Sequence, residues 1–150
     1  MNKIKQLFTF VIDILKLDNS KEKKEDKGIN VVSLFDGASC AMVALKEMGV
    51  KVNKYISSEI DSNAIMVSSK HHPEIIQAGD IKSLNYKEIL DLCDGKVDLL
   101  IGGSPCQDLS IAKSNREGLK GARSGLFWNY VDARNNFNPK FFVLEKVDSM

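Results

Sequence analysis

Residues 29–40, INVVSLFDGASC, join an apolar, β-branched run to a glycine-containing turn and the beginning of a helical pattern. Residues 29–35 favour a strand, and residues 39–48, closed by Gly49, favour a helix. A strand that leads into a helix is half of a βαβ unit, the connection that parallel strands require. This stretch therefore predicts an α/β fold.

The same alternation continues along the chain. We expect further strands over residues 52–58, 75–78, 97–101 and 140–145, and further helices over residues 61–70, 86–93 and 125–135. Asp61 is predicted to cap the second helix and Pro73 to mark its end. Because the strands are apolar runs, the sheet should be covered on both faces. We expect a Rossmann-like α/β domain with a mostly parallel five-stranded sheet and helices on both faces.

The composition agrees with one globular domain or part of one. The chain has 150 residues, of which 43% are hydrophobic and 27% charged. Its net charge of +1 says nothing about nucleic-acid binding, because a local basic groove does not show in a sum. The three cysteines lack CxxC spacing, so we expect no disulfide framework, no metal site and a reducing, cytoplasmic location.

The N-terminal segment differs from the rest of the chain. Residues 3–17 carry apolar side chains at mostly three- and four-residue intervals, which predicts an amphipathic helix that packs on the sheet domain or replaces an element that the domain lacks. Asp13 interrupts the run, which is shorter than the ~20 apolar residues of a membrane span, so we expect neither export nor a membrane partner. Residues 18–28, DNSKEKKEDKG, predict a charged linker. The expected divisions are thus 1–17, 18–28 and 29–150.

Ligands of parallel α/β sheets bind beyond the carboxyl ends of the strands, where this sequence places several acids. Asp36 follows the first strand, Glu59 the second and Asp80 the third. A dinucleotide is disfavoured, because the first turn lacks GxGxxG and Asp36 would repel a phosphate. A cationic nucleoside such as S-adenosylmethionine fits better, with Asp36 facing the cation, Glu59 the ribose and Asp80 the adenine amino group. The alternative is that Asp36 and Glu59 only cap helices.

Residues 102–107, GGSPCQ, give the strongest chemical signal and are expected to follow the fourth strand. Pro105 restricts the backbone and holds Cys106 at a defined place, which suits a nucleophile. Cys93 lies in a helical pattern and is predicted to be buried and inert, whereas Cys40 lies among the expected cofactor contacts.

Three other features have two interpretations each. Residues 116–123, REGLKGAR, are either a solvated loop or a loop that follows a nucleic-acid backbone. Phe127 and Trp128 are expected in the core rather than in a base-stacking platform. His71 and His72 are expected on the surface at a helix end, without a metal.

Taken together, six ordered segments resemble the DNA cytosine-5 methyltransferases, especially the animal de novo branch and its phage and bacterial relatives. The segments are FDGASC (35–40), SSEID (57–61), QAGDI (77–81), GGSPCQDLS (102–110), ARSGLFWNYV (122–131) and FFVLEKV (141–147). The resemblance implies that a cytosine is flipped out of duplex DNA, that Cys106 attacks ring carbon 6, and that carbon 5 takes a methyl group from S-adenosylmethionine. Glu145 would hydrogen-bond the base.

The resemblance also implies site residues, double-stranded DNA as partner and a bacterial or phage-encoded enzyme, as in restriction–modification. Catalytic roles fall to Cys106 and Glu145. Cofactor contacts fall to Phe35, Asp36, Gly37, Ala38, Ser39, Cys40, Glu59, Ile60, Asp80, Ile81 and Pro105. DNA contacts fall to Gln107, Ser110, Arg116, Lys120 and Arg123.

The sequence departs from the family's pattern in two ways. Lys146 stands where the family has asparagine, beside Glu145. The sequence also ends before the family's later motifs and its target-recognition domain. Two hypotheses follow: a fragment or half of a split methyltransferase that needs a complementing C-terminal chain, or a truncated or regulatory module that transfers nothing.

Overall fold

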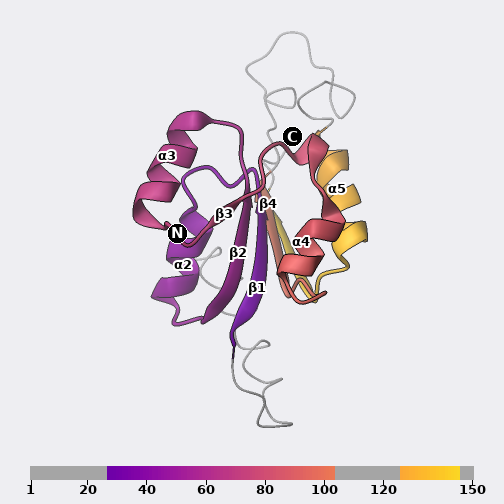
Figure 1. The fold of residues 1–150 in the computed structure, drawn as a ribbon, viewed down its shortest axis with the longest axis horizontal. Coiled ribbons are helices and arrows are strands. Elements are labelled where there is room, and N and C mark those ends of the chain that lie inside the picture. Colours follow the sequence, from indigo (N-terminus) through magenta and orange to yellow (C-terminus); the bar gives the residue numbers. More distant parts are fainter. Residues whose placement is uncertain (1–26, 104–125, 146–150) are drawn as a thin grey trace, which may run out of the picture.

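The computed structural model describes residues 27–103 and 126–145. Their centre is a five-stranded sheet with the order β3-β2-β1-β4-β5 (Figure 1). Every neighbouring pair of strands is parallel. The strands are β1 (Ile29–Leu34), β2 (Val52–Ser58), β3 (Ile76–Gln77), β4 (Leu99–Gly103) and β5 (Phe141–Glu145). The expected five-stranded parallel sheet is confirmed, and its strand order reverses between β1 and β4, where doubly wound folds bind ligands.

Helices cover both faces of the sheet, as the alternation predicts. They are α2 (Cys40–Glu47), α3 (Ser62–His71), α4 (Tyr86–Leu92) and α5 (Leu126–Phe137), with a short 3₁₀ helix, η2 (Ile81–Ser83), before α4. Figure 1 shows α2 and α3 on one side of the sheet and α4 and α5 on the other. We call these sides the α2–α3 face and the α4–α5 face.

Each face has its own core. On the α4–α5 face the buried cluster consists of Val32, Leu34, Ile56, Ile81, Ile89, Cys93, Val97, Leu100, Tyr130, Ala133 and Phe137. On the α2–α3 face it consists of Val31, Met42, Leu45, Tyr55, Ile75 and Leu99. Neighbouring residues of β1 belong to different clusters, because successive side chains of a strand point to opposite faces.

The fourth strand lies two residues later than the sequence predicts, so Gly102 and Gly103 belong to the strand. They pair in register with Leu144 and Glu145 of β5. A Cβ atom on Gly102 would lie 2.8 Å from the Tyr130 ring and 3.2 Å from the Leu34 carbonyl oxygen. Pairing and close packing across the sheet therefore outweigh the low strand propensity of glycine.

Two expectations about burial are wrong. Trp128 is 57% exposed, because the buried stripe of α5 runs through Tyr130, Ala133 and Phe137 and leaves Trp128 off it. His72 is only 9% exposed. It is the C-cap residue of α3, and its Nδ1 atom lies 3.1 Å from the Lys46 Nζ atom. Cys93 is buried, as predicted.

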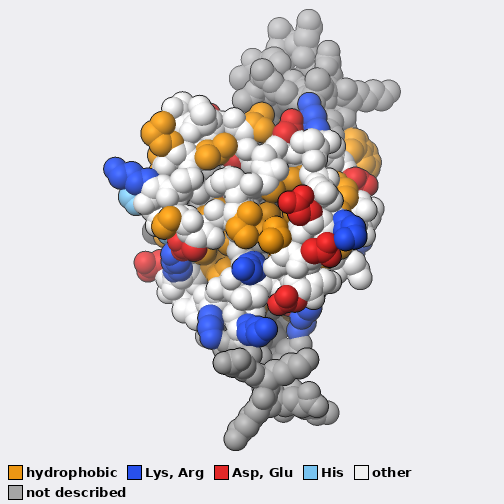
Figure 2. Space-filling view, viewed as in Figure 1, with side chains coloured by type: hydrophobic (Ala, Val, Ile, Leu, Met, Phe, Trp, Pro, Cys, Tyr) orange, Lys and Arg blue, Asp and Glu red, His pale blue; other side chains and the backbone are white. Residues whose placement is uncertain are grey.

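The space-filling view shows acidic and basic side chains interspersed, with hydrophobic side chains between them, on the face in view (Figure 2). Among residues 27–103 and 126–145, no helix is long and apolar enough to cross a membrane. The same ranges contain no group of three His, Cys, Asp or Glu side chains arranged to hold a metal ion. The expected helix over residues 3–17 and most of the charged linker lie outside the described residues.

Candidate functional site

A hollow of about 290 Å³ lies at the carboxyl edge of the sheet, the upper end in Figure 1. It is lined by Phe35, Ser58, Glu59, Ile60, Asp80, Ile81, Lys82, Gly103 and Leu126. Five of these residues, Phe35, Glu59, Ile60, Asp80 and Ile81, are predicted site residues that the fold brings together. They come from the segments after β1, β2 and β3, so the rule that ligands bind beyond strand ends locates this hollow.

Glu59 holds the edge of the hollow through its carboxylate. Its Oε2 atom accepts a hydrogen bond from the Gly37 amide at 2.7 Å. Its Oε1 atom accepts from the Ile60 amide at 2.7 Å and the Asp61 amide at 2.9 Å. Three backbone donors thus fix the orientation of this charge, and hydrogen bonds to a charged acceptor are stronger than neutral ones.

The turn between β1 and α2 has an uncommon backbone conformation. Phe35, Gly37 and Ser39 have φ angles of 57°, 60° and 61°. In a residue with a Cβ atom the left-handed region costs roughly 1–2 kcal/mol, so Phe35 and Ser39 need support from their surroundings. The Ser58 carbonyl oxygen provides part of it by accepting from the Phe35 amide at 2.8 Å and the Asp36 amide at 3.3 Å.

Asp36 points beneath the turn and does not line the hollow. Its Oδ1 atom accepts from the Tyr55 hydroxyl at 2.7 Å, and its Oδ2 atom from the Ser39 hydroxyl at 2.5 Å. The Ser39 hydroxyl in turn lies 2.6 Å from that of Ser68 on α3. Of the predicted cofactor residues, Asp36, Gly37, Ala38, Ser39 and Cys40 therefore form the turn beside the hollow and not its wall.

The helix-cap alternative for Asp36 and Glu59 is wrong. Ser39 occupies the N-cap position of α2. Asp61 caps α3, as predicted, by accepting from the Asn63 and Ala64 amides. Glu59 and Asp36 are therefore free of the capping role and hold the loops around the hollow instead.

The far wall of the hollow combines a carboxylate with apolar side chains. Asp80 is the N-cap residue of η2, and its Oδ1 atom accepts from the Lys82 amide at 3.0 Å. The Ser58 hydroxyl donates to the Gly79 carbonyl oxygen at 2.7 Å and so joins β2 to this wall. Ile60 also lines the hollow and is 73% exposed.

Sequence reasoning missed Ser58, Lys82, Gly103 and Leu126 as lining residues. Ser58 carried a usable signal, because it is the last residue of an expected strand and precedes Glu59. Lys82 directly follows two predicted site residues. Gly103 and Leu126 lie 23 positions apart in the sequence, and only the fold shows that they share a wall.

Glu145, a predicted catalytic residue, lies next to this hollow. It ends β5 opposite Gly103, and a Cβ atom on Gly103 would lie only 3.0 Å from the Glu145 Oε2 atom. Glycine therefore leaves the space that the carboxylate occupies. The remaining predicted site residues, Pro105, Cys106, Gln107, Ser110, Arg116, Lys120 and Arg123, lie outside the described residues.

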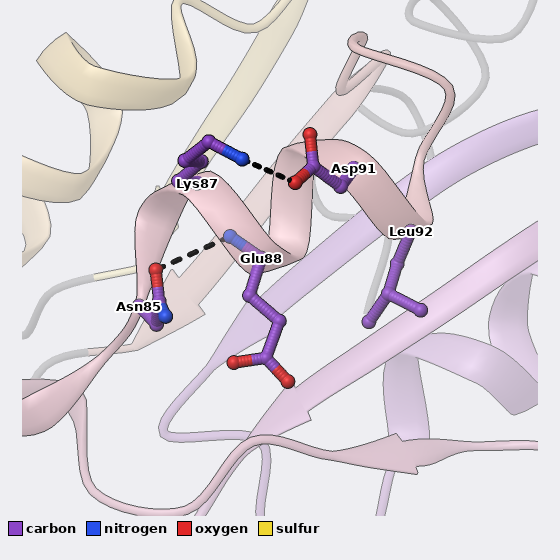
Figure 3. Close-up of a pocket in the computed structure, with 5 residues that line it drawn as sticks. All are labelled: Asn85, Lys87, Glu88, Asp91 and Leu92. Atoms are coloured by element: carbon purple, nitrogen blue, oxygen red, sulfur yellow. Dashed lines mark hydrogen bonds and ion pairs between the residues drawn. The ribbon is translucent and has the colours of Figure 1, made fainter.

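A second hollow, of about 410 Å³, lies along the outer side of α4 (Figure 3). Its lining is Asn85, Lys87, Glu88, Asp91 and Leu92. The polar groups there serve the helix itself, since Lys87 pairs with Asp91 at 2.8 Å and Asn85 caps the helix by accepting from the Glu88 amide at 3.2 Å. No strand end contributes to its lining, so it is not the candidate site although it is larger.

Comparisons with known proteins identify the family that the chain resembles. A model of the C-5 cytosine-specific DNA methylase family matches residues 29–150. The orphan methyltransferase M.SPRI of Bacillus phage SPR is 36% identical over 124 residues, covering 81% of this chain and 27% of that protein. The type II methyltransferase M.Eco47II of Escherichia coli is 32% identical over 118 residues, covering 78% of this chain and 27% of that protein.

Solved structures support the same fold. The Dnmt2 methyltransferase of S. pombe matches with a TM-score of 0.60 at 20% sequence identity, covering 80% of this chain and 35% of that one. The chain spans about a quarter of the length of the curated relatives that it matches.

Proposed function

The chain belongs to the C-5 cytosine-specific DNA methylase family, and from this premise we propose that it is the cofactor-binding and catalytic part of a DNA cytosine-5 methyltransferase. Its substrates are S-adenosylmethionine and a cytosine in double-stranded DNA. The observation that carries the proposal is the hollow at the carboxyl edge, where Phe35, Glu59 and Asp80 meet and beside which Glu145 lies. Its relatives in a phage and in Escherichia coli support a bacterial or phage-encoded enzyme of the host cytoplasm.

The residues of the hollow fit S-adenosylmethionine. Glu59 presents a fixed carboxylate for the ribose hydroxyls, and Asp80 one for the adenine amino group. Phe35, Ile60 and Ile81 supply apolar surface for a flat base. When bound, the cofactor supplies an electrophilic methyl group on a cationic sulfur. The turn at residues 36–40 adjoins the hollow and would hold the methionine part.

Cys106 and Glu145 are the proposed catalytic residues. The Cys106 thiolate would form a bond to carbon 6 of the flipped cytosine. Carbon 5 would then bond to the methyl group as the methyl–sulfur bond breaks and its electron pair returns to sulfur, which would leave as a neutral thioether. Loss of the carbon-5 proton then expels the thiolate and restores the aromatic ring. Glu145, when protonated, donates to ring nitrogen 3 and also accepts from the amino group, which stabilises the charge that develops on the ring.

DNA contacts are proposed for residues in and after the cysteine segment. Gln107 and Ser110 are close in sequence to Cys106, so they would lie near the flipped base. Arg116, Lys120 and Arg123 would bind phosphates, because such contacts need positive charge rather than a particular base. A complementing C-terminal chain is a further proposed partner, supported by the 53% exposure of Phe142 on β5, which lies at the edge of the described sheet.

Methyl transfer tests this proposal. Tritiated S-adenosylmethionine and cytosine-containing duplex DNA would be incubated with the chain alone and with a second chain that supplies the later part of its relatives. We expect transfer that depends on Cys106 and is lost in Cys106→Ser, whereas calorimetry should show that this variant still binds the cofactor.

Glu59→Ala provides the complementary variant. It removes a charged acceptor, worth roughly 1.5–3 kcal/mol per hydrogen bond, so cofactor affinity should fall by about tenfold or more. A chain that neither binds the cofactor nor transfers methyl groups in either mixture would contradict the proposal and favour the non-catalytic, regulatory alternative.

A further inference from the structure

Tyr55 is a buried ionisable side chain that the proposed mechanism does not use. It lies on β2 in the core of the α2–α3 face and is 2% exposed. It does not line the hollow. Its hydroxyl nevertheless donates to Asp36, in the turn that begins the site, at 2.7 Å.

The contact to Asp36 is one step in a buried chain of hydrogen bonds. Asp36 also accepts from Ser39, whose hydroxyl lies 2.6 Å from that of Ser68. Ser39 and Ser68 are fully buried. This series of hydrogen bonds thus links β2 and α3 to the β1–α2 turn, while Glu59 holds the same turn separately by accepting from the Gly37 amide.

The choice of a carboxylate partner distinguishes Tyr55 from an ordinary core tyrosine. A buried tyrosine hydroxyl needs a partner, and a backbone carbonyl suffices. Tyr130 has this arrangement, since its hydroxyl donates to the Val143 carbonyl oxygen at 3.0 Å. Tyr55 instead binds the carboxylate that holds Ser39, a residue whose φ angle of 61° requires support.

Burial and the neighbouring Asp36 both raise the pKa of Tyr55, in that order of size. The hydroxyl therefore keeps its proton at neutral pH and remains a donor to Asp36. Without it, the half-buried carboxylate would lose one of its two side-chain donors, and an under-satisfied charged group is costly.

We propose that Tyr55 is a positioning residue: through Asp36 and Ser39 it holds the β1–α2 turn in its left-handed conformation and so raises the affinity of the adjoining hollow for the cofactor. The effect on affinity rests on the proposed function. The effect on the turn does not, because the hydrogen bonds exist in the chain alone.

Tyr55→Phe tests the proposal, because it removes the hydroxyl and keeps the ring. Tyr86→Phe is the matched control: its hydroxyl also donates to a carboxylate, Asp132 Oδ2 at 2.9 Å, but between α4 and α5. Hydrogen exchange of the ligand-free proteins would be followed at the Phe35, Gly37 and Ser39 amides, which are all hydrogen-bonded in the turn. Calorimetry would measure the affinity for S-adenosylmethionine.

We expect exchange at these three amides to be about tenfold faster in Tyr55→Phe and unchanged in Tyr86→Phe, since Tyr55→Phe removes a hydrogen bond to a charged group that holds the turn. Cofactor affinity should fall about three- to tenfold in Tyr55→Phe only. Ser39→Ala, which breaks the chain at its next step, should produce the same local increase in exchange.

Two results would overturn the proposal. Unchanged exchange at the turn in Tyr55→Phe would show that the hydroxyl is an ordinary core group. Faster exchange with unchanged affinity would show that the turn does not control cofactor binding. If the proposed function is wrong, the unaltered protein will not bind the cofactor. The difference in amide exchange between Tyr55→Phe and Tyr86→Phe would still show whether Tyr55 holds the turn.

Discussion

The two faces of the sheet are packed by different chemistry. On the α4–α5 face, β1 contributes Val32 and then Leu34 toward the carboxyl edge. On the α2–α3 face the same strand contributes Val31 and then Ser33, and both are buried. Along β1, the first face is apolar up to the site, whereas the second face changes to a hydroxyl group near it.

This difference indicates that the two faces contribute differently to stability and to the geometry of the site. Buried hydroxyl groups destabilise a protein unless they are hydrogen-bonded. Within the described residues, the Ser57 hydroxyl and the Gln77 Oε1 atom are buried without a hydrogen-bond partner. Ser57 pairs with Gln77 across β2 and β3, and the Gln77 Nε2 atom lies 3.5 Å from the Ser68 hydroxyl, the last member of the series of hydrogen bonds that begins at Tyr55. We infer that the α4–α5 face supplies most of the folding free energy, while the α2–α3 face fixes the geometry of the site.

Leu100→Ala is the strongest way to break this comparison. Leu100 is fully buried on the α4–α5 face, so truncation removes buried apolar contacts and leaves a cavity. We expect the free energy of unfolding to fall by about 2–5 kcal/mol. Cofactor affinity of the folded protein should stay within about twofold of its original value, because Leu100 does not line the hollow and its apolar side chain makes no hydrogen bond to the β1–α2 turn.

Urea unfolding and calorimetry measure these two quantities. Leu92→Ala is the control, because Leu92 is an exposed apolar residue of α4 and should lose much less stability than Leu100. If Leu100→Ala lowered the affinity for the cofactor as much as Tyr55→Phe does, the inference that the two faces have different roles would be wrong.

The sequence predicts the framework of the molecule better than the orientation of its polar side chains. Alternating strand and helix patterns depend on local periodicity, so all five strands and four helices of the described region are found close to their expected positions. The positions of Glu59 and Asp80 follow from the rule for strand ends. Asp36 is different, because its direction depends on Tyr55, 19 positions away on the neighbouring strand.

The misplaced residues have the same physical cause. Gly102 and Gly103 join β4 because β5 lies beside them, and no local property of two glycines predicts such a pairing. Trp128 falls outside the buried stripe of α5, and a helical pattern with apolar residues at neighbouring positions does not say which of them faces the sheet. Long-range contacts decide these cases.

The two cysteines among the described residues allow the two faces to be compared directly, because Cys93 lies on the α4–α5 face and Cys40 belongs to α2. Cys93 is fully buried on the α4–α5 face, and burial is the main reason that its pKa is raised to about 11, with smaller contributions from Asp98 and Asp94. Cys40 begins α2 and is exposed. In a Cys106→Ser background, a thiol reagent should label Cys40 in the folded protein and Cys93 only after unfolding.

The pH dependence of stability gives a second measurement on Cys93. Its pKa is higher in the folded protein than the ordinary value of 9.0, so its contribution is complete below about pH 9 and is lost as the pH rises toward about 11. The loss should be at most roughly 3 kcal/mol, since one pKa unit corresponds to about 1.4 kcal/mol. Cys93→Ala should remove this part of the slope. Equal slopes for the two proteins between pH 9 and 11 would contradict the assignment of Cys93 to a dry core.

The smallest expected effect comes from an ion pair on the outside of the α2–α3 face. Lys46 of α2 lies 2.6 Å from Glu74, beside the buried His72, and its hydrogen bond is the main reason that the pKa of Glu74 is lowered. Both partners are about half exposed, so Lys46→Met should lower the free energy of unfolding at neutral pH by only about 0.2–1 kcal/mol.

The sign of the pH dependence identifies this pair. A lowered pKa means that the contribution of Glu74 is present above its ordinary value of 4.5 and is lost as the pH falls through the folded value, so the original protein and Lys46→Met should converge in acid. Lys87→Met is the matched control, because Lys87 pairs with Asp91 at 2.8 Å on α4, on the opposite face. The Lys87–Asp91 pair is more exposed than the Lys46–Glu74 pair, so its loss should be smaller still. A loss above about 2 kcal/mol in Lys46→Met would mean that charged contacts, not only hydroxyl groups, stabilise the α2–α3 face.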